Sequence, residues 1–372
     1  MENLLIIGPL PPPIQGETTA IKTILDSKKI RNEFNIDVIN TSMGKKSGTV
    51  GSFSFRKLLR DLRIIIKLLK QVYLNNLNKK FDIVYLSISQ TKLGLLRDLI
   101  ILNIVSLKTK YLIVHLHGNN LGNTIDLFGS IGKKIISNTF KKVDLGIVLG
   151  ENLINNYRGL ISSVKIVQNG VDDVVTKDNN IILRNNKNQD QEVKIIYLSN
   201  LIKAKGFIDL IEACIDLIRD GLNIKLTLAG AIYDQLEAEM IFKKVEKLGL
   251  KKFINYVGIV EGEEKRKLLL ESDIMVLPTK YPVEGQPLSI LEGMSAGLPI
   301  ISSEIGCIPE MVTDNGILLK EVNINSLKEA IKYLIDSKDV RIEMGLRSRK
   351  YYLEKYTTEK YIDRLLTIFR SV

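Results

Sequence analysis

The stretch Tyr281–Pro299, with the sequence YPVEGQPLSILEGMSAGLP, lies between two apolar runs that are typical of buried strands, Asp273–Leu277 and Ile300–Ser302. Pro287 suits the first position of a helix, because the N–H group that proline lacks would be unpaired there. Gly297 suits the position just past the helix end, and the proline two residues later bars continuation. The stretch therefore predicts a strand, a helix of about ten residues and a second strand.

The start of this helix is a predicted anion site. The N–H groups of Leu288, Ser289 and Ile290 would have no acceptor within the helix, and the helix dipole is positive at the same end. Glu284 precedes the helix and Glu292 lies beyond its first turn. Carboxylates accept hydrogen bonds from sugar hydroxyls, so this combination suggests a polyhydroxylated phosphate ester. Two solvated glutamates near a helix end are the alternative interpretation.

The spacing Glu284-x7-Glu292, followed by Ala296–Pro299 in register, resembles the motif of family 4 glycosyltransferases. These are retaining enzymes of the GT-B fold, with two Rossmann-like domains whose parallel sheets face a central cleft. The resemblance implies that Glu284 lies by the donor sugar and that Glu292 holds the nucleotide ribose. It also implies that Gln286, Leu288 and Ser289 contribute to the donor site.

The loop Ser199–Gly206 follows another apolar run, Lys194–Leu198. Its sequence, SNLIKAKG, is similar to the family pattern G-R-L-x-x-x-K-G, whose Arg and Lys grip the diphosphate. The resemblance assigns the diphosphate to Lys205, whereas Asn200 replaces the arginine and can offer only uncharged, weaker hydrogen bonds. In the family, the backbone after a glycine equivalent to Gly258 meets the base, which adds Gly258 and Ile259 to the predicted donor site.

The first half of the chain starts with an apolar run, Leu4–Ile7, and a proline-rich loop that ends at Gly16. Prolines stiffen this loop, so the backbone around Gly16 is the predicted point of close approach to a ligand. The only histidines, His115 and His117, alternate at a strand end, so they point the same way. The resemblance places His117 beside the donor sugar or the acceptor hydroxyl, and we expect His115 in the core.

The charge is unevenly distributed. The net charge is +11, and residues 1–180 contain 25 Lys and Arg against 14 Asp and Glu, whereas the rest of the chain is neutral. This asymmetry points to a polyanionic partner for the first half, either an anionic membrane or nucleic acid. The segment Phe53–Asn78 is a candidate basic amphipathic helix, and its few aromatic residues argue against a base-stacking groove. A solvated cationic helix face is an equally good interpretation.

Several site types find no support in the sequence. No cysteine or histidine cluster has metal-ligand spacing and no Asp-x-Asp occurs, so we expect neither a metal nor a cofactor. Cys214 and Cys307 lie in apolar patterns, which predicts buried thiols in a reducing compartment. We expect no signal peptide, and the longest apolar run, Leu93–Leu107, is interrupted by Arg97 and Asp98.

Alternating strand and helix patterns predict an α/β protein with parallel sheets. We expect an acceptor-side domain over residues 1–177, a polar linker over 178–192, a nucleotide-sugar domain over 193–354, and a last helix, 355–372, that returns to the first domain. The turn-like sequence Asn169–Asp172 closes the first domain.

The resemblance thus implies a metal-independent, hexosyltransferase-like glycosyltransferase that acts with retention on a nucleotide-diphosphate sugar, with UDP favoured. A hydroxyl of a glycan or polyprenyl-linked glycan in surface polysaccharide biosynthesis is the expected acceptor, and nucleic acid is not an expected partner. We expect a cytoplasmic protein, and the charge leaves peripheral attachment to the inner face of the cell membrane open. The alternatives are a non-hydrolysing nucleotide-sugar epimerase of the same fold and a basic membrane- or nucleic-acid-binding module without catalysis.

Overall fold

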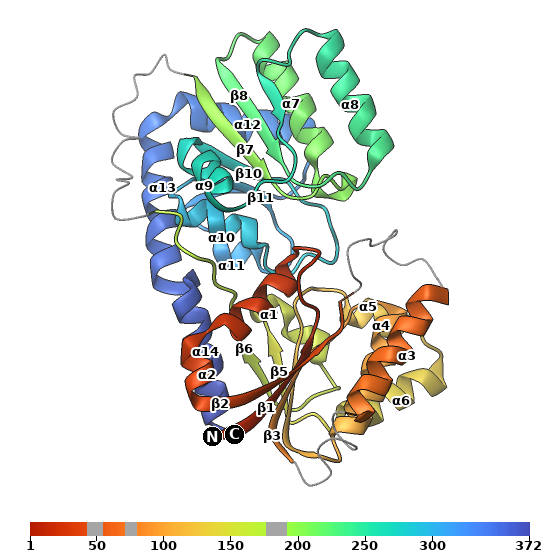
Figure 1. The fold of residues 1–372 in the computed structure, drawn as a ribbon. Helices are drawn as coiled ribbons and strands as arrows, with labels where there is room; N and C mark the ends of the chain where they lie inside the picture. Colours follow the sequence, from red (N-terminus) through yellow and green to blue (C-terminus); the bar gives the residue numbers. More distant parts are fainter. Residues whose placement is uncertain (43–54, 71–79, 176–191) are drawn as a thin grey trace. The chain divides into compact units, whose positions relative to one another are not determined.

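The computed structural model describes residues 1–42, 55–70, 80–175 and 192–372. The chain forms two compact units (Figure 1). The first contains residues 1–169 and 358–372, and the second contains residues 170–357. Each unit is built around its own parallel sheet.

The first sheet has the strand order β2-β1-β3-β4-β5-β6, and every neighbouring pair is parallel. After β1 the chain adds β2 on one side, then crosses to the other side of β1 and adds β3 to β6 there. The direction in which strands are added therefore reverses between β1 and β3. The strands of this sheet are β1 (Glu2–Gly8), β2 (Phe34–Asn40), β3 (Phe81–Ser87), β4 (Thr109–His115), β5 (Leu145–Val148) and β6 (Val164–Ile166).

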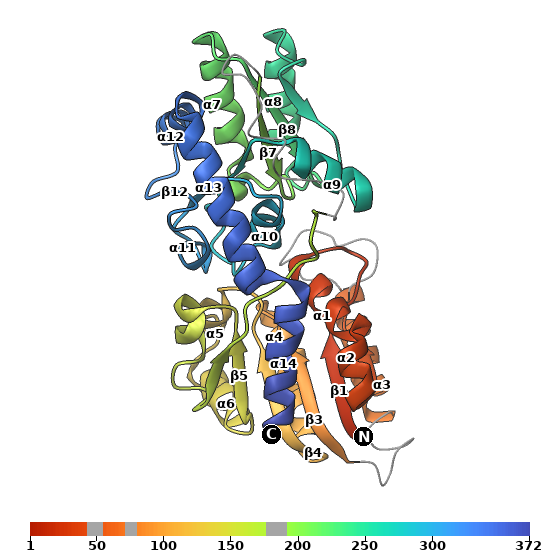
Figure 2. The ribbon, with the colours of Figure 1, turned by 90° about the vertical axis from the view of Figure 1, so that its left-hand side faces the viewer.

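Helices cover both faces of the first sheet. Figures 1 and 2 show α1, α2 and α14 on one face and α3, α4 and α6 on the other. Phe369 of α14 packs edge-on against Phe34 and Tyr85, so the last helix is part of the core of the first unit. The helices are α1 (Gly16–Asp26), α2 (Lys28–Glu33), α3 (Phe55–Leu69), α4 (Lys92–Val105), α5 (Leu121–Asp126), α6 (Ser130–Phe140) and α14 (Thr358–Arg370), with a 3-10 helix η2 at Glu151–Tyr157.

The second sheet has the order β12-β11-β10-β7-β8-β9 and is also parallel throughout. Its order reverses between β7 and β10, the two central strands. The strands are β7 (Val193–Leu198), β8 (Ile224–Ala229), β9 (Ile254–Tyr256), β10 (Ile274–Leu277), β11 (Ile300–Ser303) and β12 (Gly316–Leu319).

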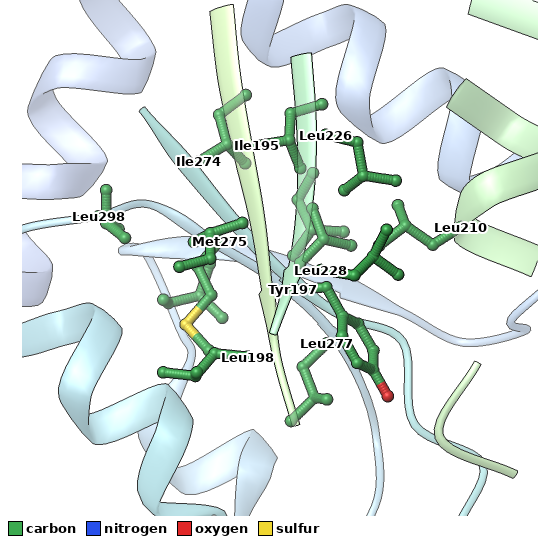
Figure 3. Close-up of a cluster of buried hydrophobic side chains, with 14 of the residues drawn as sticks. Ile195, Tyr197, Leu198, Leu210, Leu226, Leu228, Ile274, Met275, Leu277 and Leu298 are labelled. Carbon is green, nitrogen blue, oxygen red and sulfur yellow. The ribbon is translucent and has the colours of Figure 1, made fainter. Parts of the chain in front are cut away.

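The core of the second unit lies where helices pack on these central strands. Figure 3 shows Tyr197, Met275 and Leu277 of β7 and β10 among side chains of neighbouring elements. Such close-packed burial of aliphatic side chains is the main stabilising term of the unit. The helices are α7 (Phe207–Arg219), α8 (Gln235–Lys247), α9 (Gly262–Glu271), α10 (Leu288–Ser295), α11 (Ile308–Met311), α12 (Ile324–Asp336) and α13 (Lys338–Tyr351), with a 3-10 turn η4 at Lys203–Lys205 and a π turn η5 at Tyr352–Tyr356.

The predicted α/β architecture with parallel sheets is confirmed, and both cysteines are buried. The predicted turn at Asn169–Asp172 is wrong, because Val171 forms a parallel bridge with Thr357 where the chain enters and leaves the second unit. Of the predicted linker 178–192, all but residue 192 lies outside the described residues. Of the predicted helix Phe53–Asn78, the structure describes α3 and residue 70, and the remainder lies outside the described residues.

Candidate active site

The candidate site of the second unit lies at the carboxyl ends of β7 and β10. In open parallel sheets, ligands bind at the point where the strand order reverses, because the loops after the two strands there leave in opposite directions. The loop after β7 carries Lys205, and the loop after β10 carries Glu284. The topology therefore brings the two predicted donor-site segments to one place.

The loop after β7 is pinned to the end of β10 by a glycine. Gly206 has a φ of 76°, and a Cβ atom there would lie 2.2 Å from the carbonyl oxygen of Pro278. Only glycine fits this left-handed, close approach. The Lys280 N–H donates to the Ala204 carbonyl, which ties the two loops together on the other side. Lys205 is thereby held in a fixed position.

Lys205 and Glu284 form an ion pair at the sheet edge. The Nζ of Lys205 lies 3.1 Å from Oε2 of Glu284, and both side chains are largely buried. The same ammonium group lies over the ring of Tyr281, and the Thr279 hydroxyl donates to Glu284. An ion pair removed from water gains a strong Coulombic interaction but leaves each partner costly to bury alone. The pair thus places one cation and one carboxylate where a diphosphate sugar could exchange contacts with both.

Helix α10 begins at Leu288, one residue later than predicted, and Pro287 is its N-cap. The helix has eight residues, somewhat fewer than predicted, and Gly297 follows its C-cap with a φ of 68°, as expected. The N–H group of Ile290 donates to the Pro287 carbonyl, so the prediction of a free donor there is wrong. Among the described residues, the N–H groups of Leu288 and Ser289 have no acceptor, and these two remain the anion-site donors.

The loop before α10 is shaped by the segment after β11, which the sequence analysis did not consider. A Cβ atom on Gly306, whose φ is 56°, would lie 2.4 Å from the carbonyl oxygens of Glu284 and Gly285. The Cys307 N–H donates to the Gly285 carbonyl. Gln286, another predicted donor-site residue, is buried in this loop. A glycine that follows a serine-rich strand end is a weak signal, so its role could not be found from the sequence alone.

Glu292 is paired with a lysine of α9, a helix whose mixed-charge sequence is typical of a solvated face. The Nζ of Lys265, on α9, lies 2.6 Å from Oε1 of Glu292, and both side chains are partly buried. The mixed-charge pattern of Glu261–Glu271 does not distinguish this lysine from Lys267, whose side chain is 72% exposed. The contact with Glu292 thus distinguishes Lys265 from the solvated lysine of the same helix.

The remaining donor-site predictions of this unit lie at the ends of β7, β8 and β9. The Oδ1 atom of Asn200 accepts from the Ala231 N–H, so this side chain braces two loops and could donate to a ligand only through Nδ2. Gly258 has a φ of 80°, with open space where a side chain would be, and its carbonyl accepts from the Gly230 N–H. Ile259 is 66% exposed. An exposed apolar side chain beside open backbone is suited to stacking on a base.

In the first unit, the strand order reverses between β1 and β3, and a partly buried carboxyl lies there. Gly16 is the first residue of α1. The next residue, Glu17, accepts a hydrogen bond from the Ser87 hydroxyl at the end of β3. Burial is the main reason that the pKa of Glu17 is raised to about 6. The sequence analysis missed Glu17, because one glutamate at a helix start is usually solvated.

The two histidines lie at the end of β4 with their rings 4.0 Å apart. His115 is buried, as predicted, and its Nδ1 lies 2.6 Å from the Tyr85 hydroxyl. The same hydroxyl is 3.4 Å from Nε2 of His117. Burial lowers the pKa of His117 to about 3, so its ring is neutral near pH 7. Nδ1 of His117 is buried without a partner among the described residues, which makes it a candidate contact for a substrate hydroxyl.

Two further features of the described residues bear on the kind of site. They contain no group of three or more His, Cys, Asp or Glu side chains that could hold a metal ion. Within the same ranges, no helix has both the length and the apolar character needed to cross a membrane.

Part of the chain matches a known family model. The family described as Glycosyl transferases group 1 matches residues 178–351, which contain every predicted donor-site residue of the second unit.

Two curated bacterial enzymes are similar in sequence. The poly(ribitol-phosphate) alpha-N-acetylglucosaminyltransferase of Staphylococcus aureus is 26% identical over 239 residues, which cover 62% of this chain and 47% of that enzyme. The N-acetyl-alpha-D-glucosaminyl L-malate synthase of Bacillus anthracis is 26% identical over 236 residues, which cover 62% of this chain and 60% of the enzyme. The alignments thus span only about half to three fifths of these relatives.

The whole chain resembles a solved structure. Anabaena HepE in complex with UDP superposes with a TM-score of 0.74 at 16% identity, over 100% of both chains. At this identity the likeness concerns the fold, which is the GT-B fold of glycosyltransferases. Residues 178–351 thus carry the sequence pattern of the group 1 glycosyl transferases within a chain of GT-B fold.

Proposed function

We propose that this protein is a retaining glycosyltransferase that moves a sugar from a nucleotide-diphosphate sugar, most simply a UDP-sugar, to a hydroxyl of a glycan or lipid-linked glycan. The observation that carries the proposal is the Lys205–Glu284 pair at the point where the second sheet reverses its order, beside the start of α10. A cation, free backbone donors and two carboxylates are the groups that a nucleotide-diphosphate sugar needs.

The donor class is supported by the comparisons as well. The family that matches the second half is one of glycosyl transferases, and HepE, which shares the fold, was solved with UDP and with UDP-glucose. In the proposed arrangement, Glu292 binds the ribose hydroxyls and the backbone near Gly258 and Ile259 contacts the base.

Departure of the diphosphate is the step that the second unit would promote. The bond between the anomeric carbon and the phosphate oxygen breaks, and negative charge grows on the leaving diphosphate. Lys205 and the N–H groups of Leu288 and Ser289 would stabilise this charge, because oriented donors in a water-poor site need no reorganisation as the charge develops. Glu284, held by Lys205, would bind hydroxyls of the transferred sugar.

The first unit is proposed to supply His117. Since its ring is neutral near pH 7, it would contact a hydroxyl through a hydrogen bond and not through a charge. Its buried, unpartnered Nδ1 supports a ligand-contacting role. Gly16, at the start of α1, is proposed as a point where backbone approaches the donor.

The acceptor is proposed to be a carbohydrate of the cell surface, in polysaccharide assembly. The Staphylococcus aureus relative is named for poly(ribitol-phosphate), a polyanionic polymer. The positive charge of the first half supports an acceptor that is itself anionic or is held at an anionic membrane, with the protein attached peripherally to its cytoplasmic face.

The experiment is a transfer assay with UDP-glucose, UDP-galactose and UDP-N-acetylglucosamine, with and without a polyprenyl-linked sugar acceptor. We expect acceptor-dependent release of UDP, undiminished by EDTA because the proposed mechanism uses no metal. NMR of the product should show the α configuration of the donor retained. Absence of acceptor-dependent transfer with every donor would contradict the proposal. Conversion of the donor sugar without an acceptor would instead identify an epimerase.

A further inference from the structure

Helices α3, α4 and α6 form one layer on the first sheet, with α4 between the other two (Figure 1). Their inner residues are apolar and pack toward the sheet, such as Ile64 and Leu68 on α3 and Leu95 and Leu102 on α4. Their outer residues would be expected to be polar on an ordinary solvated surface. They are not.

Among the described residues of this layer, eight large aliphatic side chains are exposed on its outer surface. On α3 the exposed residues recur at helical spacing and occupy one side of the helix, next to the basic residues. On α4 and on α6 the exposed residues are one turn apart. The eight are Leu59, Leu62, Ile66, Leu69, Leu96, Ile100, Ile131 and Ile135. We call this set the α3–α4–α6 face.

The exposed charges in the described part of these three helices have one sign, and one of them, Lys133, pairs with Asp126 of the neighbouring α5. The three helices contain nine Lys and Arg residues and two Asp residues, a net charge of +7. The two acidic residues, Asp61 and Asp98, are buried and lie against Arg60 and Arg97. The exposed charges of the described part of these helices, Arg63, Lys67, Lys133 and Lys134 among them, are therefore all positive.

We propose that the α3–α4–α6 face docks on an anionic lipid bilayer, with its leucine and isoleucine side chains in the headgroup region and its lysines and arginines on the lipid phosphates. Interfacial helices bind membranes through such a combination of buried apolar area and positive charge. A clustered apolar surface is otherwise unfavourable in water and marks an interaction site.

A lipid surface fits these residues better than a nucleic acid does. A nucleic-acid groove would use its cations on phosphates but would leave the eight aliphatic side chains without a partner. Among the side chains that the structure describes on these helices, no exposed aromatic ring is available for base stacking. A second copy of the chain is also disfavoured, because two faces of the same positive charge repel each other.

The inference goes beyond the proposed transfer reaction and does not depend on it. An active-site variant such as Glu292→Gln should bind vesicles as the unaltered protein does, so vesicle binding and catalysis can fail separately. If vesicle binding is present and transfer absent, only the proposed function is wrong. If transfer is present and vesicle binding absent, this inference and the proposed peripheral attachment are wrong, and the transfer reaction is unaffected.

The test is flotation of the full chain with vesicles of phosphatidylcholine alone and with about one third phosphatidylglycerol. We expect binding to the anionic vesicles that weakens with salt, since surface charge attracts within a Debye length only. The variant Leu62→Gln/Ile66→Gln should lower the partition coefficient at least about tenfold, because two side chains leave the headgroup region. The variant Arg63→Gln/Lys67→Gln should weaken binding and flatten its salt dependence.

Matched controls come from α8 in the second unit. Leu236 and Met240 are as exposed as the residues of the α3–α4–α6 face, at 76% and 60%, and Lys243 and Lys247 are exposed lysines on the same helix. The variants Leu236→Gln/Met240→Gln and Lys243→Gln/Lys247→Gln should leave vesicle binding unchanged.

Four results would overturn the proposal. They are absence of flotation with anionic vesicles, an equal loss in the α8 controls, tighter binding of single-stranded RNA than of anionic vesicles, and a dimer in solution that the Leu62→Gln/Ile66→Gln change dissolves. Circular dichroism of each variant verifies that it is folded, and the charge variant, which alters exposed side chains only, provides a second readout if the apolar variant is unstable.

Discussion

The Nζ of Lys265 lies 2.6 Å from Oε1 of Glu292, so the carboxylate proposed to hold the nucleotide ribose is already in an ion pair with a lysine. In the loop before the same helix, α10, Glu284 pairs with Lys205. The four side chains together are electrically neutral. A diphosphate that enters this site therefore meets two lysines whose charge is already shared with glutamates.

This neutrality predicts a charge-dependent effect of Lys265→Ala. The site would gain a net negative charge, and an unshielded carboxylate near the diphosphate repels it. We expect the affinity for UDP to fall about tenfold, which corresponds to about 1.4 kcal/mol. The affinity for uridine, which lacks phosphates, should change little. Isothermal titration calorimetry with both ligands measures the two effects.

Lys267→Ala is the matched control, because this lysine lies on the same helix with a largely exposed side chain. It should leave both affinities unchanged. An equal loss of UDP and uridine binding in Lys265→Ala would show that Lys265 only orients Glu292, and would contradict the electrostatic explanation.

The Lys205–Glu284 pair should be energetically coupled. Each single change, Lys205→Met or Glu284→Gln, leaves a largely buried partner without its counter-ion, and we expect each to destabilise the second unit by about 2–4 kcal/mol. The double variant should cost less than the two together by at least about 1 kcal/mol. Urea unfolding of the four proteins completes the cycle. Additive effects would mean that the pair contributes nothing to stability.

Gly206→Ala should be strongly destabilising, because a Cβ atom at this left-handed residue would collide with the Pro278 carbonyl. Gly249 is the matched control, with a φ of 70° and open space around its Cβ position. Gly249→Ala should cost only about 1–2 kcal/mol, the conformational penalty alone. A thermal unfolding scan in which both variants lose the same stability would show that the approach to β10 does not matter.

The raised pKa of Glu17 predicts a pH-dependent stability. Between its unfolded pKa of 4.5 and its folded pKa of about 6, the folded protein binds the proton more tightly, so stability falls as the pH rises through this window. The loss from this group is about 2 kcal/mol at most. Glu17→Gln keeps a hydrogen-bond acceptor for Ser87 but removes the titration. Its stability relative to the unaltered protein should therefore increase from pH 4.5 to pH 7, and a constant difference would contradict the assignment.

Much of the fold could be predicted from the sequence, because its signals are local. Short apolar runs such as Leu4–Ile7, Lys194–Leu198 and Asp273–Leu277 predicted strands that the structure contains, and Gly297 marked the end of α10. Where prediction failed, the deciding contact was distant in sequence. Val171 pairs with Thr357 across the whole second unit, which no local turn pattern can indicate.

In the candidate site too, residues in a local motif could be predicted, whereas residues that depend on a partner distant in sequence could not. The resemblance to a family motif pointed to Glu284, Glu292 and the lysine of the β7 loop, and the structure shows each of them in an ion pair. Lys265 and Glu17 were missed, since a lysine on a mixed-charge helix and a glutamate at a helix start look solvated until the chain is folded. Their partners, Glu292 and Ser87, lie 27 and 70 residues away.

The central claim is that the carboxyl edge of the second sheet binds a nucleotide-diphosphate sugar. The most direct measurement is the thermal shift of the full chain with nucleoside diphosphates and their sugar conjugates, compared with the Glu292→Ala variant. The account predicts stabilisation by one nucleotide series, UDP first, and its loss in the variant. No shift with any nucleotide, or an equal shift in Glu292→Ala, would contradict it.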